Sequence, residues 1–368
     1  MSKTYRAIGL MSGTSLDGID LALIESNGED KIQVIGNDYL SYESEFRNKL
    51  RSIIFSTKIA IEDIKIIENE LTIQHANLVN NFMQKNNLSN EDIDVIGFHG
   101  QTIYHNPAQK ITWQIGNSQL LASMTKINVI GDFRVNDVIE GGQGAPLVPI
   151  YHYYLFSKID KPSAILNIGG ICNLTYFDNQ LTNLIAFDVC YGNAPMNDLV
   201  FKKLGREFDE NGDIARLGSP NIEIAKQIID APIFNTKIPR SFSRNDFDII
   251  LRPLENLELK DALATHIYII SQILARDIEN NIPHLPKNIV VCGGGSKNFF
   301  LIENIQKRLP KCEVISAKKL GMNVDFIEAE AFGFLAIRKL RNLPISFPKT
   351  TGTKSIYGSK GGVLFEVN

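Results

Sequence analysis

The sequence predicts an α/β protein of two domains, and three observations lead to this prediction. The chain has 368 residues, which is more than a single hydrophobic core usually holds. Stretches typical of buried strands alternate along it with stretches typical of helices. A strand, a glycine turn and a second strand occur at both 5–25 and 163–177, a weak internal repeat that indicates a duplicated domain pair.

The first half of the chain contains short apolar runs and two long helical patterns. In 61–86, apolar residues recur at the spacing of one helix face. The predicted elements, in order, are strands near 5–11, 18–25 and 31–39, helices over 43–55 and 61–86, a strand within 94–105, and a loop, helix and strand over 112–134. The segment EGGQGAPLVP (140–149) is rich in glycine and proline, so we interpret it as the crossing between domains.

The second half repeats the alternation. The segment 163–177 is a predicted hairpin, and 287–309 contains a strand, a triple-glycine turn and an amphipathic helix. We therefore expect a first domain of residues 1–135 together with about 343–368, and a second domain of residues 136–342.

Composition and charge exclude several classes of protein. Hydrophobic residues make up 44% and charged residues 21%, and the net charge is −3, so the chain lacks the basic field that nucleic-acid or acidic-membrane partners require. No signal peptide and no apolar run of about 20 residues is found. The 4 cysteines form no CxxC pair and the 6 histidines no HExxH motif. We expect a cytoplasmic enzyme with reduced thiols and no metal held by protein ligands alone.

The first turn, within GLMSGTSLDGID (9–20), is a candidate phosphate site. Glycine allows a close backbone approach, and successive N–H groups in a tight turn bind anions. The hydroxyls of Thr14 and Ser15 add donors, and Asp17 or Asp20 could hold water on Mg²⁺. An ordinary hairpin turn with local capping remains an equal alternative.

Two later glycine turns have the same ambiguity. Asn167-Ile168-Gly169-Gly170 lies at the turn of the second hairpin, and Gly293-Gly294-Gly295-Ser296 follows a buried strand. A glycine turn at the carboxyl end of a strand is where α/β folds bind ligands, although a plain turn and a plain βα loop are the alternatives. The GxxxxGK[ST] motif, a GxGxxG motif after the first strand and the GxSxG motif are absent from the sequence.

Polar side chains follow several buried strands. His99 could bind a sugar hydroxyl or could be a satisfied core histidine, and Arg134 could clamp a carboxylate or phosphate or form an interdomain salt bridge. Asp188 ends an apolar strand and is suited to act as a general base, or it is a turn aspartate. Glu328 opens a helix, where acidic residues usually offset the helix dipole.

Taken together, these motifs resemble the anhydro-N-acetylmuramic acid kinase family, a branch of the fold superfamily of acetate and sugar kinases, Hsc70 and actin. The resemblance rests on eight motifs in order: GLMSGTSLDGID, GFHGQT, TWQIG, GDFR, GGQGAPLVP, LNIGGICN, FD…GN…D and VCGGGSKN. It implies a two-domain, actin-like (ribonuclease H-like) α/β fold with the active site in the interdomain cleft. It also implies ATP and Mg²⁺ as cofactors, an anhydro-sugar substrate and a homodimer.

The resemblance also implies roles for individual residues. Asp188 matches the catalytic aspartate, which would activate a water that attacks C1 of the anhydro-sugar while O6 takes the γ-phosphoryl group of ATP. The positions that match ATP-binding segments are Gly13, Thr14, Ser15, Leu16, Asp17, Gly18, Ile19, Asp20, Asn167, Gly169, Gly170, Gly293, Gly294 and Gly295. The positions that match sugar-binding residues are His99, Gln101, Thr102, Arg134 and Glu328.

The chain departs from the family pattern in three places. Val189-Cys190-Tyr191 stands where the family usually has Thr-Gly-Pro, PRSFSRNDF (239–247) stands where a Ser-Thr-Gly-Arg-Glu stretch is common, and Asn117 replaces a common aspartate. A tyrosine near the expected sugar leaves open a kinase for a different sugar or acid. A non-catalytic nucleotide-binding protein is the third hypothesis.

Overall fold

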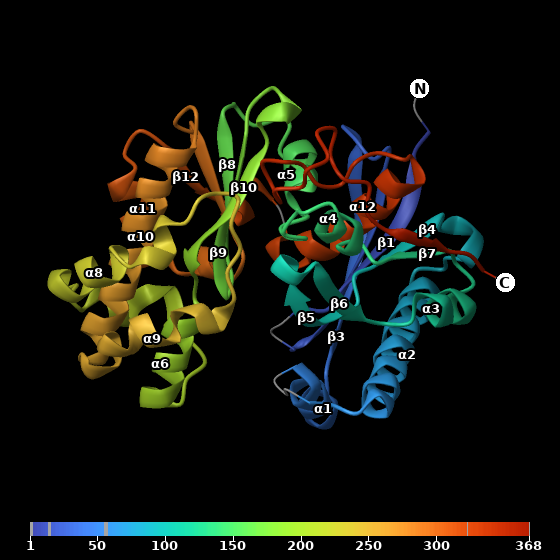
Figure 1. Cartoon of the computed structure of the whole chain (residues 1–368), viewed down its shortest axis with the longest axis horizontal. Helices are drawn as coiled ribbons and strands as arrows, with labels where there is room; N and C mark the ends of the chain where they lie inside the picture. Colours follow the sequence, from blue (N-terminus) through green and yellow to red (C-terminus); the bar gives the residue numbers. More distant parts are fainter. Residues whose placement is uncertain (1–2, 14–15, 55–57, 322, 368) are drawn as a thin grey trace. The chain divides into compact units, whose positions relative to one another are not determined.

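The chain folds into two compact units, Met1–Ser157 with Phe326–Asn368, and Lys158–Asp325 (Figure 1). The computed structural model describes residues 3–13, 16–54, 58–321 and 323–367. Each unit contains one mixed β-sheet with helices packed against it.

The first unit has a six-stranded sheet in the order β13-β7-β4-β1-β2-β3. Strands β1, β2 and β3 form an antiparallel meander, while β4 runs parallel to β1 and β7 parallel to β4. The strands of this sheet are β1 (Tyr5–Met11), β2 (Gly18–Ser26), β3 (Ile32–Ser41), β4 (Val95–Phe98), β7 (Val129–Gly131) and β13 (Val363–Phe365). A separate two-stranded ribbon pairs β5 (Gln101–Asn106) with β6 (Ile111–Ile115).

The helices of the first unit cover its sheet with apolar faces. In α2 (Ile61–Lys85), the buried residues Ile64, Ile67 and Leu71 keep the spacing that predicted the helix. The other helices are α1 (Ser44–Ile54), α3 (Ser118–Thr125), α4 (Val135–Ile139), α5 (Pro149–Leu155) and α12 (Ile327–Leu340).

Glycines in two adjacent strands explain how α12 reaches the sheet. Gly9 in β1 lies beside Gly97 in β4. A Cβ on Gly9 would lie 1.8 Å from the carbonyl oxygen of Ala329, and one on Gly97 would lie 2.1 Å from that of Phe332. Any side chain there would therefore push α12 off the sheet.

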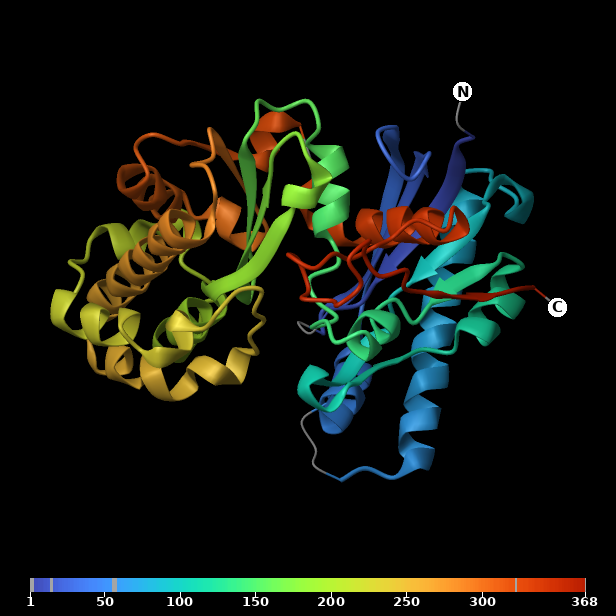
Figure 2. The same cartoon turned by 45° about the horizontal axis from the view of Figure 1, so that its top comes forward.

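The second unit has a five-stranded sheet in the order β10-β9-β8-β11-β12. Its strands are β8 (Ser163–Ile168), β9 (Ile171–Phe177), β10 (Ile185–Tyr191), β11 (Asn288–Cys292) and β12 (Glu313–Ser316). Its helices are α6 (Ala194–Leu204), α7 (Asp213–Arg216), α8 (Ile222–Ile229), α9 (Asp248–Leu251), α10 (Leu259–Asn281) and α11 (Phe299–Arg308). In Figure 2, α10 and α11 run along one face of this sheet, where Ile270, Ile273 and Leu274 join the core of the unit.

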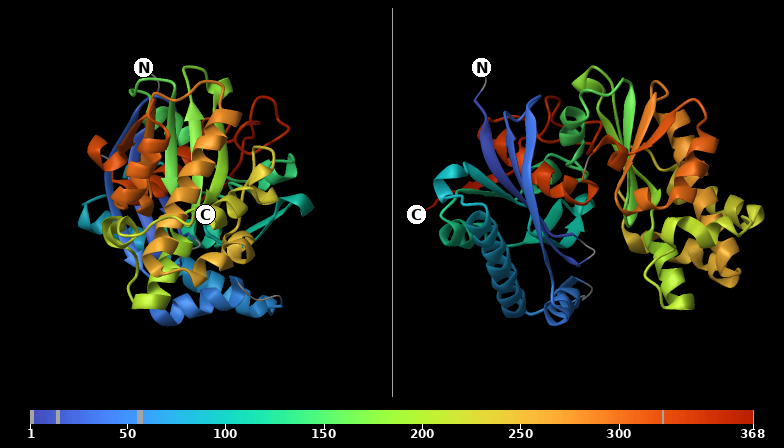
Figure 3. Two further views of the ribbon diagram at one scale, coloured as in Figure 1. Left: turned by 90° about the vertical axis from the view of Figure 1, so that its left-hand side faces the viewer. Right: turned by 180° about the vertical axis from the view of Figure 1, so that it is seen from behind.

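The two sheets share the arrangement of five strands, as expected for the duplicated domain pair that the two hairpins predicted. In each unit the first three strands form an antiparallel meander, and two further strands continue the sheet from the first strand in parallel (Figure 3). This repeated order confirms the predicted duplicated, actin-like (ribonuclease H-like) fold.

The domain boundaries differ from the predicted ones. The units change at 157/158 and 325/326, so α4, α5, the segment 140–149 and α12 belong to the first unit. The glycines of 140–149 do not mark a crossing, because they close tightly around the buried Asp137. Gly144 N donates to Asp137 Oδ2 at 2.6 Å, and a Cβ on Gly142 would lie 2.2 Å from the same oxygen.

The cysteines and the helices of the described residues can also be compared with the predictions from composition. All four cysteines are buried and free, as predicted for reduced core thiols. None of the helices in the described ranges has the length and apolar character needed to cross a membrane.

Candidate active site

Residues on both sides of the turn between β1 and β2 form hydrogen bonds with other residues of the same unit. Ser12 Oγ lies 2.7 Å from Gln101 Oε1 and 2.7 Å from the Tyr42 hydroxyl. The carbonyl oxygen of Asp17 accepts the Tyr42 N–H at 2.9 Å. Of the predicted ATP-binding segment, Thr14 and Ser15 lie outside the described residues.

The other residues of that segment lie partly in the turn and partly in strand β2. Leu16 has φ +57° and donates its N–H to Gly13 O at 3.2 Å, which is the geometry of a tight turn. Gly18, Ile19 and Asp20 belong to β2, and the Ile19 side chain is fully buried. Ile19 could therefore contribute only its backbone to a ligand.

A second group in the first unit joins His99, Arg134 and Glu328. His99 Nδ1 lies 2.7 Å from Gly100 O, and its Nε2 accepts the Arg134 Nε–H and Nη2–H, both at 3.0 Å. These contacts require a neutral imidazole with the proton on Nδ1. Burial and the Arg134 charge accordingly hold the pKa of His99 well below its usual value. His99 thus orients Arg134 and is itself satisfied.

Arg134 and Glu328 influence each other electrostatically. Burial lowers the pKa of Arg134 to about 10, and the Glu328 carboxylate opposes that shift. The pKa of Glu328 is raised by desolvation, with Asp17 raising it further and Arg134 lowering it, although the side chain still contacts solvent. The structure therefore brings together Arg134, Glu328 and Asp17, which are far apart in the sequence.

Gln101 and Thr102 have supporting contacts. Gln101 is fully buried and accepts from Ser12 Oγ, while Thr102 Oγ1 accepts a hydrogen bond from Gln114 Nε2 at 3.2 Å. In this conformation Gln101 links β5 to the β1–β2 turn.

In the second unit, the two predicted glycine turns lie at the same sheet edge. The turn of Gly169 and Gly170 follows β8, the turn of Gly293–Gly295 follows β11, and these two strands are adjacent and parallel. Gly293 has φ +74°, and a Cβ there would lie 2.4 Å from Asn167 Oδ1.

The amino end of α6 completes this edge. Asn193 donates its backbone N–H to Gly169 O at 2.8 Å, and its Nδ2 lies 3.3 Å from Ile168 O. A Cβ on Gly169 or Gly170 would meet no atom closer than 3.8 Å, so the space over this turn is open. Open glycine backbone beside a helix N-terminus is suited to phosphate oxygens.

Asp188 is a buried carboxylate with one backbone donor. It lies in β10 and is 9% exposed, and its Oδ2 accepts the Phe242 N–H at 2.7 Å. Burial raises the pKa of Asp188 to about 7, against the lowering effects of the Phe242 N–H and the Arg240 charge. A carboxylate that titrates near neutral pH is matched to general-base work.

Tyr191 does not line a ligand site, contrary to the expectation that a tyrosine lies near the sugar. It is fully buried in the core of the second unit, where its ring packs edge-on against Phe247 and its hydroxyl lies 3.2 Å from His266 Nδ1. Tyr191 therefore no longer supports the hypothesis that the substrate is a different sugar or acid.

Sequence reasoning missed the groups that hold Asp188 in position. Arg240 and Asp277 form a buried ion pair beneath β10. Arg240 lies within the PRSFSRNDF departure, which drew attention to that segment, but no spacing rule connects it to Asp188 or to Asp277.

No group of three or more histidine, cysteine, aspartate or glutamate side chains that could hold a metal ion occurs among the residues described. Mg²⁺ prefers one or two carboxylates together with phosphate oxygens and water, so Asp17 and Asp20 are a compatible but partial ligand set.

A family model and several curated proteins match nearly the whole chain. A family model described as "Anhydro-N-acetylmuramic acid kinase" matches residues 5–364. Curated proteins named anhydro-N-acetylmuramic acid kinase include that of Zymomonas mobilis, 40% identical over 94% of this chain and 96% of that protein. Those of Rhodopseudomonas palustris and Pelagibacter ubique are each 39% identical, over 97% and 99% of this chain and 98% and 99% of those proteins.

Among solved structures, an activator of 2-hydroxyisocaproyl-CoA dehydratase from Clostridium difficile with bound ADPNP is 14% identical with a TM-score of 0.46. It covers 92% of this chain and 96% of its own.

Proposed function

Because the chain belongs to the anhydro-N-acetylmuramic acid kinase family, we propose that it uses ATP to open and phosphorylate 1,6-anhydro-N-acetylmuramic acid. The products are N-acetylmuramic acid 6-phosphate and ADP, and the reaction serves recycling of cell-wall peptidoglycan. The observation that carries the chemical assignment is the buried Asp188, whose pKa is raised to about 7.

Asp188 acts as the general base. Its carboxylate takes a proton from a water molecule, the water oxygen bonds to C1 of the sugar, and the bond from C1 to the bridging O6 breaks. O6 bonds to the γ-phosphorus of ATP as the bond to the ADP oxygen breaks. Capture of O6 by phosphorus replaces the second carboxylic acid that a glycosidase uses to protonate its leaving group. The proton on Asp188 then returns to solvent.

Arg134 binds the acidic group of the sugar. Within the described residues, its contacts to His99 and to Gly144 O use three of the five guanidinium N–H donors. One N–H on each terminal nitrogen is left for a carboxylate, which suits bidentate pairing. We assign further sugar contacts to Glu328 and to the loop from His99 to Thr102, where Gln101 acts by supporting Ser12.

The glycine turns bind the nucleotide. The open backbone at Gly169 and Gly170 fits phosphate oxygens, and Gly293–Gly295 fits the adenosine. We also assign the segment from Gly13 to Asp20 to phosphate binding. Asp17 and Asp20 would hold Mg²⁺ through water, and the ion would neutralise charge that develops on the transferred phosphoryl group. A homodimer and a cytoplasmic location remain predictions.

Product mass tests the proposal. The purified protein is incubated with ATP and 1,6-anhydro-N-acetylmuramic acid, and ADP release is compared with the mass of the sugar product. We expect one ADP per product, and a product heavier than the substrate by one water and one phosphoryl unit. A product that gains only the phosphoryl unit would mean that the ring stays closed. ATP binding without turnover would favour the non-catalytic alternative.

A further inference from the structure

The strand that carries Asp188 is interrupted where the aspartate lies. The pairing of β10 with β9 shifts register between Asp188 and Cys190, so Val189 is an extra residue in β10. The Asp188 N–H bonds to Arg240 O at 3.0 Å. Bulges of this kind re-aim a side chain at the cost of local sheet pairing, so the displaced carbonyl groups need other partners.

The guanidinium of Arg240 supplies those partners. Its Nε donates to Asp188 O at 2.9 Å and its Nη2 to Val189 O at 3.1 Å. Its Nη1 donates to Phe234 O at 3.2 Å and to Thr236 O at 3.0 Å. The remaining Nη2 donor goes to Asp277 Oδ2, so all five N–H groups of the side chain are used.

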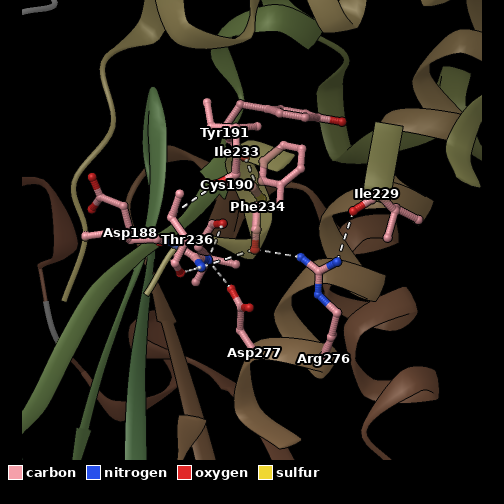
Figure 4. Close-up of polar contacts among 11 residues, drawn as sticks. Asp188, Cys190, Tyr191, Ile229, Ile233, Phe234, Thr236, Arg276 and Asp277 are labelled. Carbon is pink, nitrogen blue, oxygen red and sulfur yellow. Dashed lines mark hydrogen bonds and ion pairs between the residues drawn. The ribbon is translucent and has the colours of Figure 1, made fainter. Parts of the chain in front are cut away.

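Asp277 on α10 balances the charge of Arg240. Both side chains are buried, at 6% and 4% exposed, and the four carbonyl groups around Arg240 carry no net charge. The adjacent Arg276 anchors the same region, because it donates to Ile229 O at 2.9 Å and to Phe234 O at 3.0 Å. Figure 4 shows these bonds converging beneath β10, with the carboxylate of Asp188 directed away from them.

The backbone next to Arg240 holds Asp188 at two points. Arg240 O accepts the Asp188 N–H, and the Phe242 N–H donates to Asp188 Oδ2 at 2.7 Å. The segment 240–242 therefore fixes both the backbone and the carboxylate orientation of Asp188. Its own position depends on the guanidinium bonds to the Phe234 and Thr236 carbonyls.

We propose that Arg240, held by Asp277, is a positioning residue that fixes the bulge in β10 and aims the Asp188 carboxylate at the reacting water. This inference deepens the proposed function and rests on it. Arg240 acts through the backbone of Asp188 and Val189, and not by touching the substrate.

The charge of Arg240 also affects when Asp188 ionises. Arg240 supplies the charge that acts on Asp188, and the titratable groups grouped with Arg240 are Asp277 and Arg276 of α10 and the buried thiol of Cys190 in β10. The Arg240 charge lowers the pKa of Asp188, so its removal raises that pKa further. The acid limb of the kcat profile then moves to higher pH.

The test compares Arg240→Gln and Arg240→Lys with wild type in the ADP-release assay across pH. For Arg240→Gln we expect kcat to fall about 100-fold, the magnitude of a misplaced catalytic group, with KM for the sugar and Kd for ATP within about threefold. We expect the acid limb to move upward. Arg240→Lys keeps the charge and therefore returns the acid limb to its original position, but it has three donors in place of five, so we expect it to recover only part of kcat.

A matched control removes an arginine from a surface pair in the same unit. Arg216 bonds to Glu303 at 2.7 and 2.9 Å, and both side chains are exposed, so Arg216→Gln should leave the kinetics unchanged. An Arg240→Gln variant with wild-type kcat would overturn the proposal. A low kcat with an unmoved acid limb would also overturn it. Such a result would mean that the substitution only lowers the fraction of correctly folded enzyme, without changing the pKa of Asp188.

If Arg240→Gln fails to fold, the Asp277→Asn variant tests the proposal in its place. This variant keeps the shape and the hydrogen bond but leaves the Arg240 charge unbalanced. We expect a kcat about tenfold lower, with the acid limb at the same or lower pH. Wild-type kcat, or an upward shift, would contradict the proposal. Turnover by wild type in the same assay separates these outcomes from failure of the proposed function, which would appear as inactive wild type.

Discussion

The buried Asp188 should reduce stability in the pH range in which it functions, and its replacement by asparagine should reveal this cost. Burial raises its pKa from 3.8 to about 7, so the folded state binds this proton more tightly than the unfolded state does. Stability is then lost as pH rises between the two values. At about 1.4 kcal/mol per pKa unit, the raised pKa costs about 1 kcal/mol of stability at pH 4.5, where folding requires Asp188 to take up a proton, and about 4 kcal/mol at pH 8, where the buried carboxylate is ionised.

Asp188→Asn removes that pH-dependent cost. The buried amide brings a penalty of its own, but that penalty is the same at both pH values and cancels in the comparison. The advantage of the variant over wild type should therefore grow by about 3 kcal/mol from pH 4.5 to pH 8, or roughly 6 °C or more in the Tm of a unit of this size.

The assay is calorimetric unfolding of both proteins at the two pH values. Glu303→Gln is the control, because Glu303 belongs to an exposed pair with Arg216 and should change Tm little at either pH. An advantage of Asp188→Asn that does not grow with pH would refute the raised pKa of Asp188 and the argument from burial.

Three further predictions concern single residues. Gly97→Ala should destabilise the protein by about 3 kcal/mol or more, because its Cβ would lie 2.1 Å from the Phe332 carbonyl oxygen; a Tm within 2 °C or so of wild type would contradict the close packing. His99→Phe leaves the Arg134 donors without an acceptor and should raise KM for the sugar about tenfold, with kcat within about threefold; an unchanged KM would separate Arg134 from sugar binding. Gly170→Ala should leave Tm unchanged but weaken ATP binding about tenfold in calorimetry, because its methyl group occupies the open space over the turn; unaltered affinity would remove this turn from the nucleotide site.

Local patterns predicted much of the fold. The helix over 61–86 and the hairpins at 5–25 and 163–177 were recognisable because apolar periodicity and glycine turns are written in consecutive residues. The similarity of the two hairpins indicated a duplicated domain pair, and each sheet does contain a hairpin that is extended by parallel strands.

The predicted domain boundary was wrong for a physical reason. Glycine serves both flexible crossings and close packing, and composition cannot distinguish these uses. In 140–149 the glycines let the chain close around Asp137, which also accepts hydrogen bonds from Ser346 and Thr351. Those partners lie more than 200 residues away, so nothing local revealed them.

The candidate site was predicted in part. Its separate glycine turns and Asp188 followed from motifs, and their assigned roles remain predictions. The Arg240–Asp277 pair could not be found, because the two residues are 37 positions apart and Arg240 is 52 from Asp188. Tyr191 was misjudged because every residue of β10 is buried, on both faces of the strand, whereas simple alternation would expose one face.

The role of Asp188 as base is tested most directly by the pH dependence of kcat in wild type together with the turnover of Asp188→Asn. We predict that kcat falls tenfold per pH unit below about 7, and that Asp188→Asn binds ATP as wild type does while its turnover drops at least about 1,000-fold. A flat kcat from pH 5 to 8 or so, or substantial turnover by Asp188→Asn, would contradict the account.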